Sequence, residues 1–199
     1  MNKILVMIYD GFSMYEISPL TSILAWSQTD WQIDVIAAEH KPYQTEDGFD
    51  VMPQMTFEDV QNIQAYQMLV MPGIANYHTV LPDQRNIVFL SRFKTRPRPV
   101  IAAISASPIL LAKAGLLDDT KFVSGLFESA YEEERFIPKR NLVRKPVVSD
   151  NGIVTSTAFF PREFGITAAH AIGVNVPKNI FEQFGTDASA DDLTFRDNG

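Results

Sequence analysis

The 199-residue sequence contains no cysteine and only three histidines. The lack of cysteine excludes disulfide bonds, thiolate metal sites and a cysteine nucleophile together. It also excludes redox sensing through a thiol, because the oxidation ladder starts from a thiolate. With no bridges to interpret, the composition leaves the redox compartment of the protein open.

Basic charge is also scarce, since 17 Lys and Arg residues stand against 24 Asp and Glu residues, for a formal net charge of −7. Binding of nucleic acid or anionic membranes relies on clustered Lys and Arg, so this balance disfavours both kinds of partner. The one basic run, residues 138–145, indicates a solvated loop or edge. We therefore expect a small-molecule ligand or substrate, no nucleic acid and no membrane.

Long hydrophobic runs are absent, and no apolar stretch approaches the roughly 20 residues that a membrane-spanning helix needs. Residues 1–8 carry one charge followed by a short apolar run, which leads into Tyr9-Asp10-Gly11 without a small-residue cleavage site. This pattern predicts a first strand and not a signal peptide. We therefore expect a cytoplasmic location.

The composition is that of one globular unit. With 46% hydrophobic residues, the chain is long enough for one well-buried core. We expect a single domain over residues 1–186. Residues 187–199 are polar and acidic, with Leu193 and Phe195 as the large apolar residues, and they predict a loose tail.

Short apolar runs alternate with longer amphipathic ones, a pattern typical of a mostly parallel sheet with helices on both faces. The expected strands are Lys3–Ile8, Gln32–Ala37, Met68–Met71, Val100–Ile104 and Lys121–Ser124. Residues 83–95 predict a crossover helix, residues 147–155 a pair of short strands around Asp150-Asn151-Gly152, and residues 162–172 a late helix. The predicted fold is a three-layer α/β sandwich of flavodoxin-like type.

The most informative segment is residues 99–108, a buried strand that ends at Ser105 and leads into a helical run at residues 109–114. Such a strand-to-helix turn is typical of a nucleophile elbow, which needs small residues on either side, here Ala103 and Ser107. The ordinary alternative is that Ser107 caps the helix and that Ser105 is a loop residue.

A second candidate is the turn at Pro72-Gly73, which closes the strand Met68–Met71. Glycine lets the backbone turn sharply and present its amides at the carboxyl edge of the sheet. Paired with the amide after Ser105, these amides would form an oxyanion hole. A plain strand-ending turn explains the same residues.

A third candidate is Glu16, which lies where the first strand gives way to a helix. A carboxylate at that place is most often a capping charge at a helix start. The alternative is an acid or base for the elbow.

These three segments, in this order, resemble the ThiJ/PfpI (DJ-one) superfamily, which has the class I glutamine-amidotransferase-like fold. The resemblance rests on the opening strand with Asp10-Gly11-Phe12, the Met71-Pro72-Gly73 turn, and the elbow around Ser105 followed by residues 111–117. Residues 150–156 are similar to the family hairpin before its last core helix. The likeness covers nearly the whole chain.

The resemblance implies roles for individual residues. Ser105 stands where typical members carry a reactive cysteine, and Glu16 matches the family's protonated glutamate. The amides of Gly73, Ile74 and Ala106 match the oxyanion cradle.

A histidine often follows the elbow in the family, and the matching position falls at about Gly125. The histidines of the chain are His40, His78 and His170, and each is interpreted as a surface or packing residue. His78 is also a distant candidate for a base near the pocket rim. A serine hydroxyl needs a base to become a nucleophile, so both departures weaken a cysteine-type mechanism.

No set of His, Asp or Glu shows metal-ligand spacing and no nucleotide-binding glycine loop is present, so we expect neither a metal nor a cofactor. The resemblance implies a homodimer. Tyr15, Trp26 and Trp31 are candidates either for its interface or for the core.

Two functions fit these residues. One is a small-molecule-binding, regulatory or stress-related protein without cysteine chemistry. The other is a hydrolase, hydratase or lyase that acts on a small carbonyl compound through Ser105 and Glu16. The resemblance extends to a branch with isonitrile hydratases and the sensing domains of transcription regulators, although no DNA-binding segment is present. Serine peptidase activity is not expected without the histidine, and glutamine amidotransferase activity is not expected either.

Overall fold

The structure is a computed structural model, and it describes residues 1–27, 29–177, 179–183 and 185–194. The strands are β1 (Asn2–Met7), β2 (Trp31–Ala37), β3 (Tyr43–Gln44), β4 (Asp50–Val51), β5 (Met55–Thr56), β6 (Met68–Met71), β7 (Val100–Ile104), β8 (Val147–Asp150) and β9 (Ile153–Ser156). The α-helices are α1 (Met14–Trp26), α2 (Tyr77–Val80), α3 (Gln84–Ser91), α4 (Pro108–Lys113), α5 (Glu128–Glu133) and α6 (Pro161–Ala171). Three short 3₁₀ turns cover Ile63–Ala65, Arg92–Lys94 and Lys139–Asn141.

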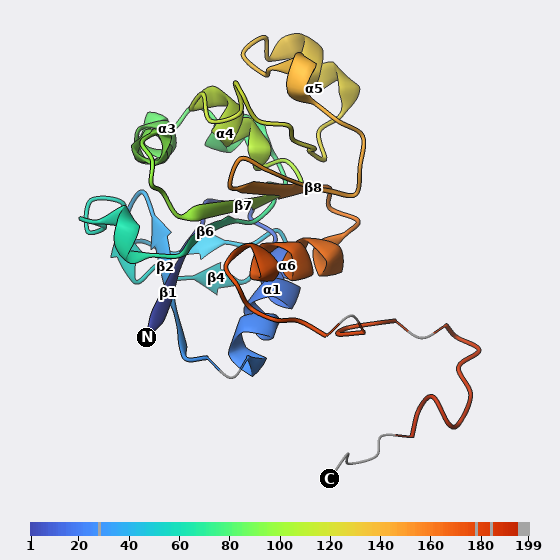
Figure 1. The fold of residues 1–199 in the computed structure, drawn as a ribbon. Coiled ribbons are helices and arrows are strands. Elements are labelled where there is room, and N and C mark those ends of the chain that lie inside the picture. Colours follow the sequence, from blue (N-terminus) through green and yellow to red (C-terminus); the bar gives the residue numbers. More distant parts are fainter. Residues whose placement is uncertain (28, 178, 184, 195–199) are drawn as a thin grey trace.

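The core of the fold is a seven-stranded sheet in the order β5-β2-β1-β6-β7-β9-β8. All neighbouring strands run parallel except β8, which is antiparallel to β9. Helices α1 and α6 cover one face, and α3 and α4 lie on the other (Figure 1). This is the predicted three-layer α/β fold.

The central strands are continuous apolar runs because both of their faces are buried. Every residue of β6 is buried, and β7 is buried from its second residue onward. In the register, Leu69 of β6 lies between Leu5 of β1 and Ile101 of β7. These three strands therefore end together, and the loops that follow them meet at the carboxyl edge of the sheet.

Four of the five predicted strands are confirmed as β1, β2, β6 and β7, with ends shifted by one residue at most. The predicted strand Lys121–Ser124 is wrong. Its middle is buried, but only Phe122 forms a bridge, to Leu142 outside the sheet. The reason is that β9 occupies the position beside β7, so no ladder is left for this segment.

The predicted helices and the hairpin are confirmed. The predicted helix at residues 83–95 is α3 followed by a 3₁₀ turn, with the side chain of Asp83 capping the start of α3 by accepting from the Arg85 amide at 3.1 Å. Strands β8 and β9 join through Asn151 and Gly152, whose positive φ values of 54° and 75° suit a two-residue hairpin turn.

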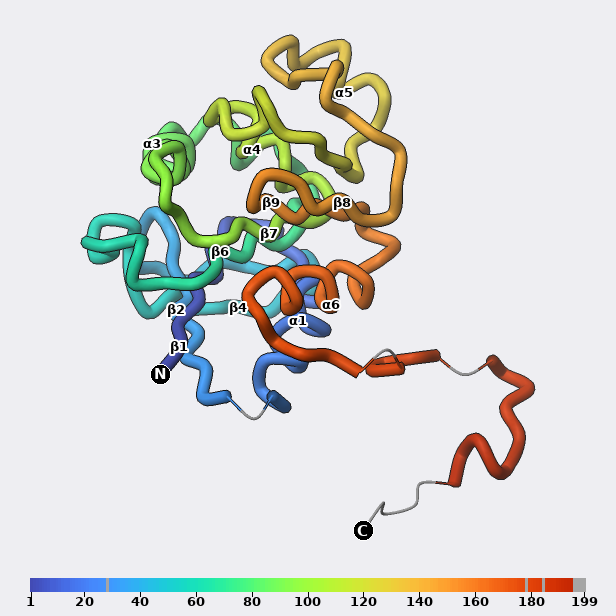
Figure 2. The backbone as a smooth tube through the Cα atoms, viewed as in Figure 1, coloured from blue at the N-terminus to red at the C-terminus, as the bar shows by residue number. Residues whose placement is uncertain are grey.

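Helices α1 and α6 lie side by side in both ribbon and tube views (Figures 1 and 2). Gly165 of α6 makes this approach possible, because a Cβ at this position would come within 2.9 Å of the Leu20 amide nitrogen of α1. The approach fixes α1, and with it Glu16, against the sheet.

After α6 the chain stays in contact with the body through Ile180 and Phe181, which pack against the core, and the last described stretch, residues 185–194, leads away from it (Figure 2). Of the predicted tail at residues 187–199, residues 195–199 lie outside the described part, and the division from a domain at residues 1–186 stays a prediction. Within the described residues, no helix is both long and apolar enough to span a membrane.

Candidate ligand site at the Ser105 elbow

Ser105 follows the last residue of β7 and has a φ of 62°. For a residue other than glycine, this left-handed conformation costs about 1–2 kcal/mol, so the surrounding structure must hold it in place. The Ser105 amide donates to the carbonyl of Ser156 at 2.8 Å, and the Ser105 carbonyl accepts from the Gly125 amide at 2.7 Å. The elbow is thus fixed from both sides, while its side chain stays partly exposed.

Ser107 does not act as the helix cap that its position suggests. Its hydroxyl donates toward the carbonyls of Ile104 at 2.8 Å and Met71 at 3.1 Å, and no side-chain cap hydrogen bond forms at the start of α4. Nearby, the hydroxyl of Tyr9 donates to the carbonyl of Pro72. These buried hydroxyls tie the ends of β1, β6 and β7 together, and so set the Pro72-Gly73 turn against the elbow.

Glu16 lies in the first turn of α1, and Ser13 precedes that helix. Their spacing is that of a capping box, in which the serine and glutamate side chains satisfy each other's backbone amides. The structure has no side-chain cap there, and the Ser13 amide donates instead to the Gly73 carbonyl at 3.1 Å. The carboxyl group of Glu16 turns instead toward Gly73 and Ser105.

The environment of Glu16 shifts its acidity strongly. Burial raises the pKa of Glu16 from 4.5 to about 7, and the charge of Glu46 adds to this, while contacts from the Ser105 hydroxyl and the Gly73 amide oppose it. Oε2 of Glu16 has no hydrogen-bond partner among the described residues, although only 7% of the residue is exposed. Glu16 is therefore largely protonated just below neutral pH.

The short hairpin of β3 and β4 brings Glu46 to this site. The Gly11 amide donates to the Gln44 carbonyl at 2.8 Å, and the Glu46 amide donates to the Phe12 carbonyl at 3.0 Å. This contact was not predicted from the sequence, because residues 43–51 carry no periodic signal that links them to α1.

The predicted oxyanion amides come from two loops. Phe12 pairs with Ile74 in an isolated bridge, which holds the loop after β6 beside the start of α1. The amides of Ile74 and Ala106 make no backbone hydrogen bond to another described residue, whereas the Gly73 amide contacts the Glu16 carboxyl. Two amides of the predicted cradle thus have no backbone partner among the described residues, and the role of all three stays a prediction.

Gly125 occupies the place where a histidine was expected from the resemblance. A Cβ on Gly125 would lie 3.2 Å from Cα and 3.4 Å from Oγ of Ser105, so the segment packs directly over the elbow. Glycine leaves that side open, because both Gly125 and the Ser105 side chain reach the surface. The site has no imidazole next to the hydroxyl.

The three histidines lie elsewhere. His40 and His170 are exposed at the ends of β2 and α6. His78 is exposed on α2, with its ring 4.1 Å from the Tyr77 ring, and makes no hydrogen bond to Ser105 or Glu16. Among the described residues there is also no group of three or more side chains suited to a metal ion.

Two buried hydroxyls near the elbow have no hydrogen-bond partner in the described part of the chain, and neither was singled out from the sequence. They are Oγ of Ser13, before α1, and Oγ1 of Thr157, which follows the strand residue whose carbonyl holds Ser105. Buried hydroxyls normally find a partner, so these atoms indicate room for water or a polar ligand atom. A serine or threonine in a loop gives no such signal in a sequence.

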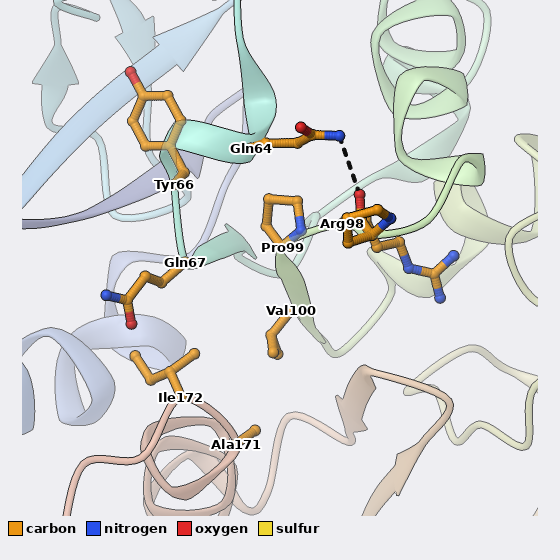
Figure 3. Close-up of a pocket in the computed structure, with 9 residues that line it drawn as sticks. Gln64, Tyr66, Gln67, Arg98, Pro99, Val100, Ala171 and Ile172 are labelled. Carbon is orange, nitrogen blue, oxygen red and sulfur yellow. Dashed lines mark hydrogen bonds between the residues drawn. The ribbon is translucent and has the colours of Figure 1, made fainter.

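A cavity of about 470 Å³ lies at the opposite, amino-terminal edge of the sheet (Figure 3). Val100 and Ile172 form its apolar side, and Gln64 donates to the Pro97 carbonyl at 3.4 Å. The Tyr66 hydroxyl is also engaged, by Asp34. Because ligands of open α/β sheets bind at the carboxyl ends of the strands, the Ser105 elbow is the better candidate site.

A family model for the DJ-1/PfpI family matches residues 2–168 of this chain. The fold is similar to that of a DJ-1 superfamily protein from Agrobacterium tumefaciens, at 21% identity and a TM-score of 0.77, covering 89% of this chain and 93% of the other. It is also similar to Toxoplasma gondii DJ-1 in oxidized form, at 21% identity and a TM-score of 0.71, covering 87% and 91%. No curated protein matches the sequence significantly. With the family model covering most of the chain and the elbow in place, this protein belongs to the DJ-1/PfpI family.

Proposed function

We propose that the protein binds a small carbonyl- or carboxylate-containing molecule at the Ser105 elbow and forms no covalent intermediate with it, in a regulatory or stress-related role. The observation that carries this proposal is the pairing of a strained, partly exposed Ser105 with a buried Glu16 whose pKa is raised to about 7. A carboxylic acid that stays protonated donates a hydrogen bond to a ligand oxygen and is a poor base for the serine hydroxyl.

The surrounding groups complete a polar binding site. The free amides of Ile74 and Ala106 are donors for a carbonyl or carboxylate oxygen, and Ser105 adds a hydroxyl. The opening over Ser105, where Gly125 has no side chain, gives the entry path. No thiol is present, so the cysteine chemistry of typical family members is outside this protein's reach.

Amide-detected NMR during titration with acetate, acetamide and pyruvate tests the proposal. Saturable shifts are expected at Ala106 and Ile74, and Gly125→Leu, which covers Ser105, removes them. Ser129→Leu, an exposed change on nearby α5, leaves binding intact. Shifts that survive Gly125→Leu, or no shifts at the elbow with any of the compounds, would contradict a ligand site there.

A second candidate function is hydrolysis or hydration of a small carbonyl compound, favoured by the contact of Glu16 with the Ser105 hydroxyl. Ionised Glu16 would take the Ser105 proton as Oγ bonds to the carbonyl carbon, and the carbonyl electron pair would move onto oxygen beside the Ile74 and Ala106 amides. The leaving group would depart with the proton from Glu16. Water would then release the acyl group, passing a proton through Glu16 and returning Oγ to the hydroxyl form.

Intact-mass measurement during incubation with activated esters separates the two functions. If the protein is a hydrolase, we expect an acyl adduct that Ser105→Ala and Glu16→Gln both abolish. We also expect the rate of turnover to rise as pH passes through 7. If the protein only binds its ligand, we expect no adduct in the unaltered chain, in Ser105→Ala or in Glu16→Gln. Any slow loss of ester is then the same with and without the Ser105→Ala change.

We also propose that the protein is a homodimer. Tyr15 and Trp26 are largely exposed on α1, whereas Trp31 packs against the core, which leaves Trp26 as the aromatic side chain for an interface and Tyr15 for either a partner or a ligand. Sedimentation equilibrium measures the oligomeric state directly. A mass of one chain at micromolar concentration would contradict this proposal and leave the ligand site unaffected.

A further inference from the structure

A second cavity, of about 330 Å³, lies between the amino-terminal ends of α1 and α6. Its volume is at the lower end of the roughly 300–1,000 Å³ typical of small-molecule sites. Neither Ser105 nor Glu16 lines it, so it is distinct from the elbow. The residues that matter for its chemistry are three aromatic side chains and three charged ones, Tyr15, Phe159, Phe160, Arg162, Glu163 and Glu182.

Two of the aromatic rings are held out in solvent. Phe159 is 87% exposed and Tyr15 is 61% exposed, although both stand at the wall of a cavity. Single exposed apolar side chains are common, but exposed rings that gather at one cavity mark a candidate binding surface. The cation–π contacts among the described residues lie on other rings, so the faces of Tyr15 and Phe159 are open to a cation.

The charge of the described cavity wall is negative. Among the described residues that line it, Arg162 is the one basic residue, and its guanidinium is engaged by the Glu163 carboxylate at 3.1 Å and by the Ile180 carbonyl at 2.7 Å. Glu182 adds a second carboxylate, so the described lining residues carry a net charge of −1, from one basic and two acidic side chains. The whole chain, at −7, reinforces this sign.

The chain after α6 is anchored where it forms part of this wall. The Arg162 contact holds Ile180, and the ring of Phe181 lies 5.0 Å from the ring of Trp26. These two contacts precede Glu182 directly and set it beside the cavity. The position of the Glu182 carboxylate is therefore fixed by these contacts of Ile180 and Phe181 with the body of the protein.

We propose that this cavity binds a small organic cation, such as a quaternary ammonium or an alkylated amine. Aromatic faces beside a carboxylate are the combination that recognises such ions, because the ring quadrupole attracts the charge while the rings cover the alkyl groups. Arg162, the described cation of the wall, is already bound by Glu163 and Ile180. The proposal does not depend on the function of the elbow.

The test uses choline as the probe in titration calorimetry of the full chain. We expect saturable millimolar binding, about tenfold tighter than that of the neutral isostere in which a tert-butyl group replaces the trimethylammonium group. Glu182→Gln and Phe159→Leu each weaken choline binding by about threefold or more. Phe127→Leu, which alters an equally exposed phenylalanine outside the cavity, leaves it unchanged.

Equal affinity for choline and its neutral isostere, or no saturable binding of choline, overturns the proposal. So does loss of self-association in Phe159→Leu together with no effect on choline, since that result makes the same face an interface between copies. Elbow ligands are titrated in parallel with Glu182→Gln, and their binding is expected to stay as in the unaltered chain. Failure of one site is thereby distinguished from failure of the other.

Discussion

The carboxyl group of Glu16 lies so close to Gly73 that position 73 has no room for a side chain. A Cβ added to Gly73 would overlap Oε2 of Glu16 and would lie 2.8 Å from Cβ of Ser105. The glycine of the turn after β6 is therefore a requirement for Glu16 to reach the elbow. This relationship links the backbone of one loop to the acid of the candidate site.

Gly73→Ala is expected to destabilise the fold by about 2–4 kcal/mol, because the methyl group must displace Glu16 or Ser105. Glu16→Ala in the same chain should recover part of this loss, since it removes the main clash. A double-mutant cycle by urea denaturation measures the coupling between the two positions. Additive effects of the two changes would mean that the side chains do not meet.

The raised pKa of Glu16 predicts a pH-dependent stability. The folded state holds the Glu16 proton up to about pH 7, whereas in the unfolded state the carboxyl loses it near its ordinary value of 4.5. Between these values the folded state binds more protons, so the free energy of unfolding falls as pH rises, and it levels off above 7. The stabilisation relative to Glu16→Gln should decline by about 2–3 kcal/mol over that window, after allowance for partial solvent access.

Urea denaturation from pH 4 to pH 8 of the unaltered chain and of Glu16→Gln measures this difference. Glu46→Gln is the matched control, because it removes the exposed carboxylate that raises the pKa of Glu16 and should move the decline toward lower pH. Parallel stability profiles for the unaltered chain and Glu16→Gln would show that Glu16 is not buried in its neutral form.

The strained backbone of Ser105 predicts a gain in stability from glycine. Ser105→Gly relieves the left-handed conformation and should raise the free energy of unfolding by about 0.5–1 kcal/mol. Ser105→Ala keeps the strain and loses only the hydroxyl, so it separates the two contributions. Thermal unfolding checks all three proteins, and a lower melting temperature for Ser105→Gly than for Ser105→Ala would argue against backbone strain at the elbow.

Because the chain has no cysteine, a single introduced thiol reports the accessibility of the elbow to chemical reagents. Ser105→Cys places the sole thiol of the chain at a partly exposed position, so iodoacetamide and peroxide should modify it in the folded state. Ser107→Cys, at a fully buried position, should react only after unfolding. Mass spectrometry follows both. An inert Ser105→Cys, or peroxide-dependent oxygen addition at Ser105 itself, would contradict the account.

Much of this site could be predicted from local sequence, because its residues lie directly after the ends of strands. Buried apolar runs followed by Pro72-Gly73 and by Ser105 marked the ends of β6 and β7, and parallel strands bring such ends together. The resemblance then supplied the role of Glu16, whose own pattern favoured a capping charge at a helix start, whereas its carboxyl group contacts Ser105 and Gly73.

The parts that could not be predicted depend on pairings distant in the chain. The segment Lys121–Ser124 has the composition of a strand, and only the position of β9 beside β7 shows that it lies outside the sheet. Likewise, Glu46 approaches Glu16 because a hairpin packs against Phe12, and neither the hairpin nor the contact has a local signature. The unpartnered hydroxyl of Ser13 is a property of the packed structure alone.

The proposed ligand site depends on a Ser105 that stands beside a glutamic acid whose pKa is raised to about 7. Carbon-detected NMR of the glutamate side-chain carboxyls, with the Glu16 signal assigned from its loss in Glu16→Gln, measures that pKa directly. We expect a midpoint of about 7. A midpoint at the ordinary glutamate value of 4.5 would show an ionised, solvated carboxylate and would contradict the proposed ligand site.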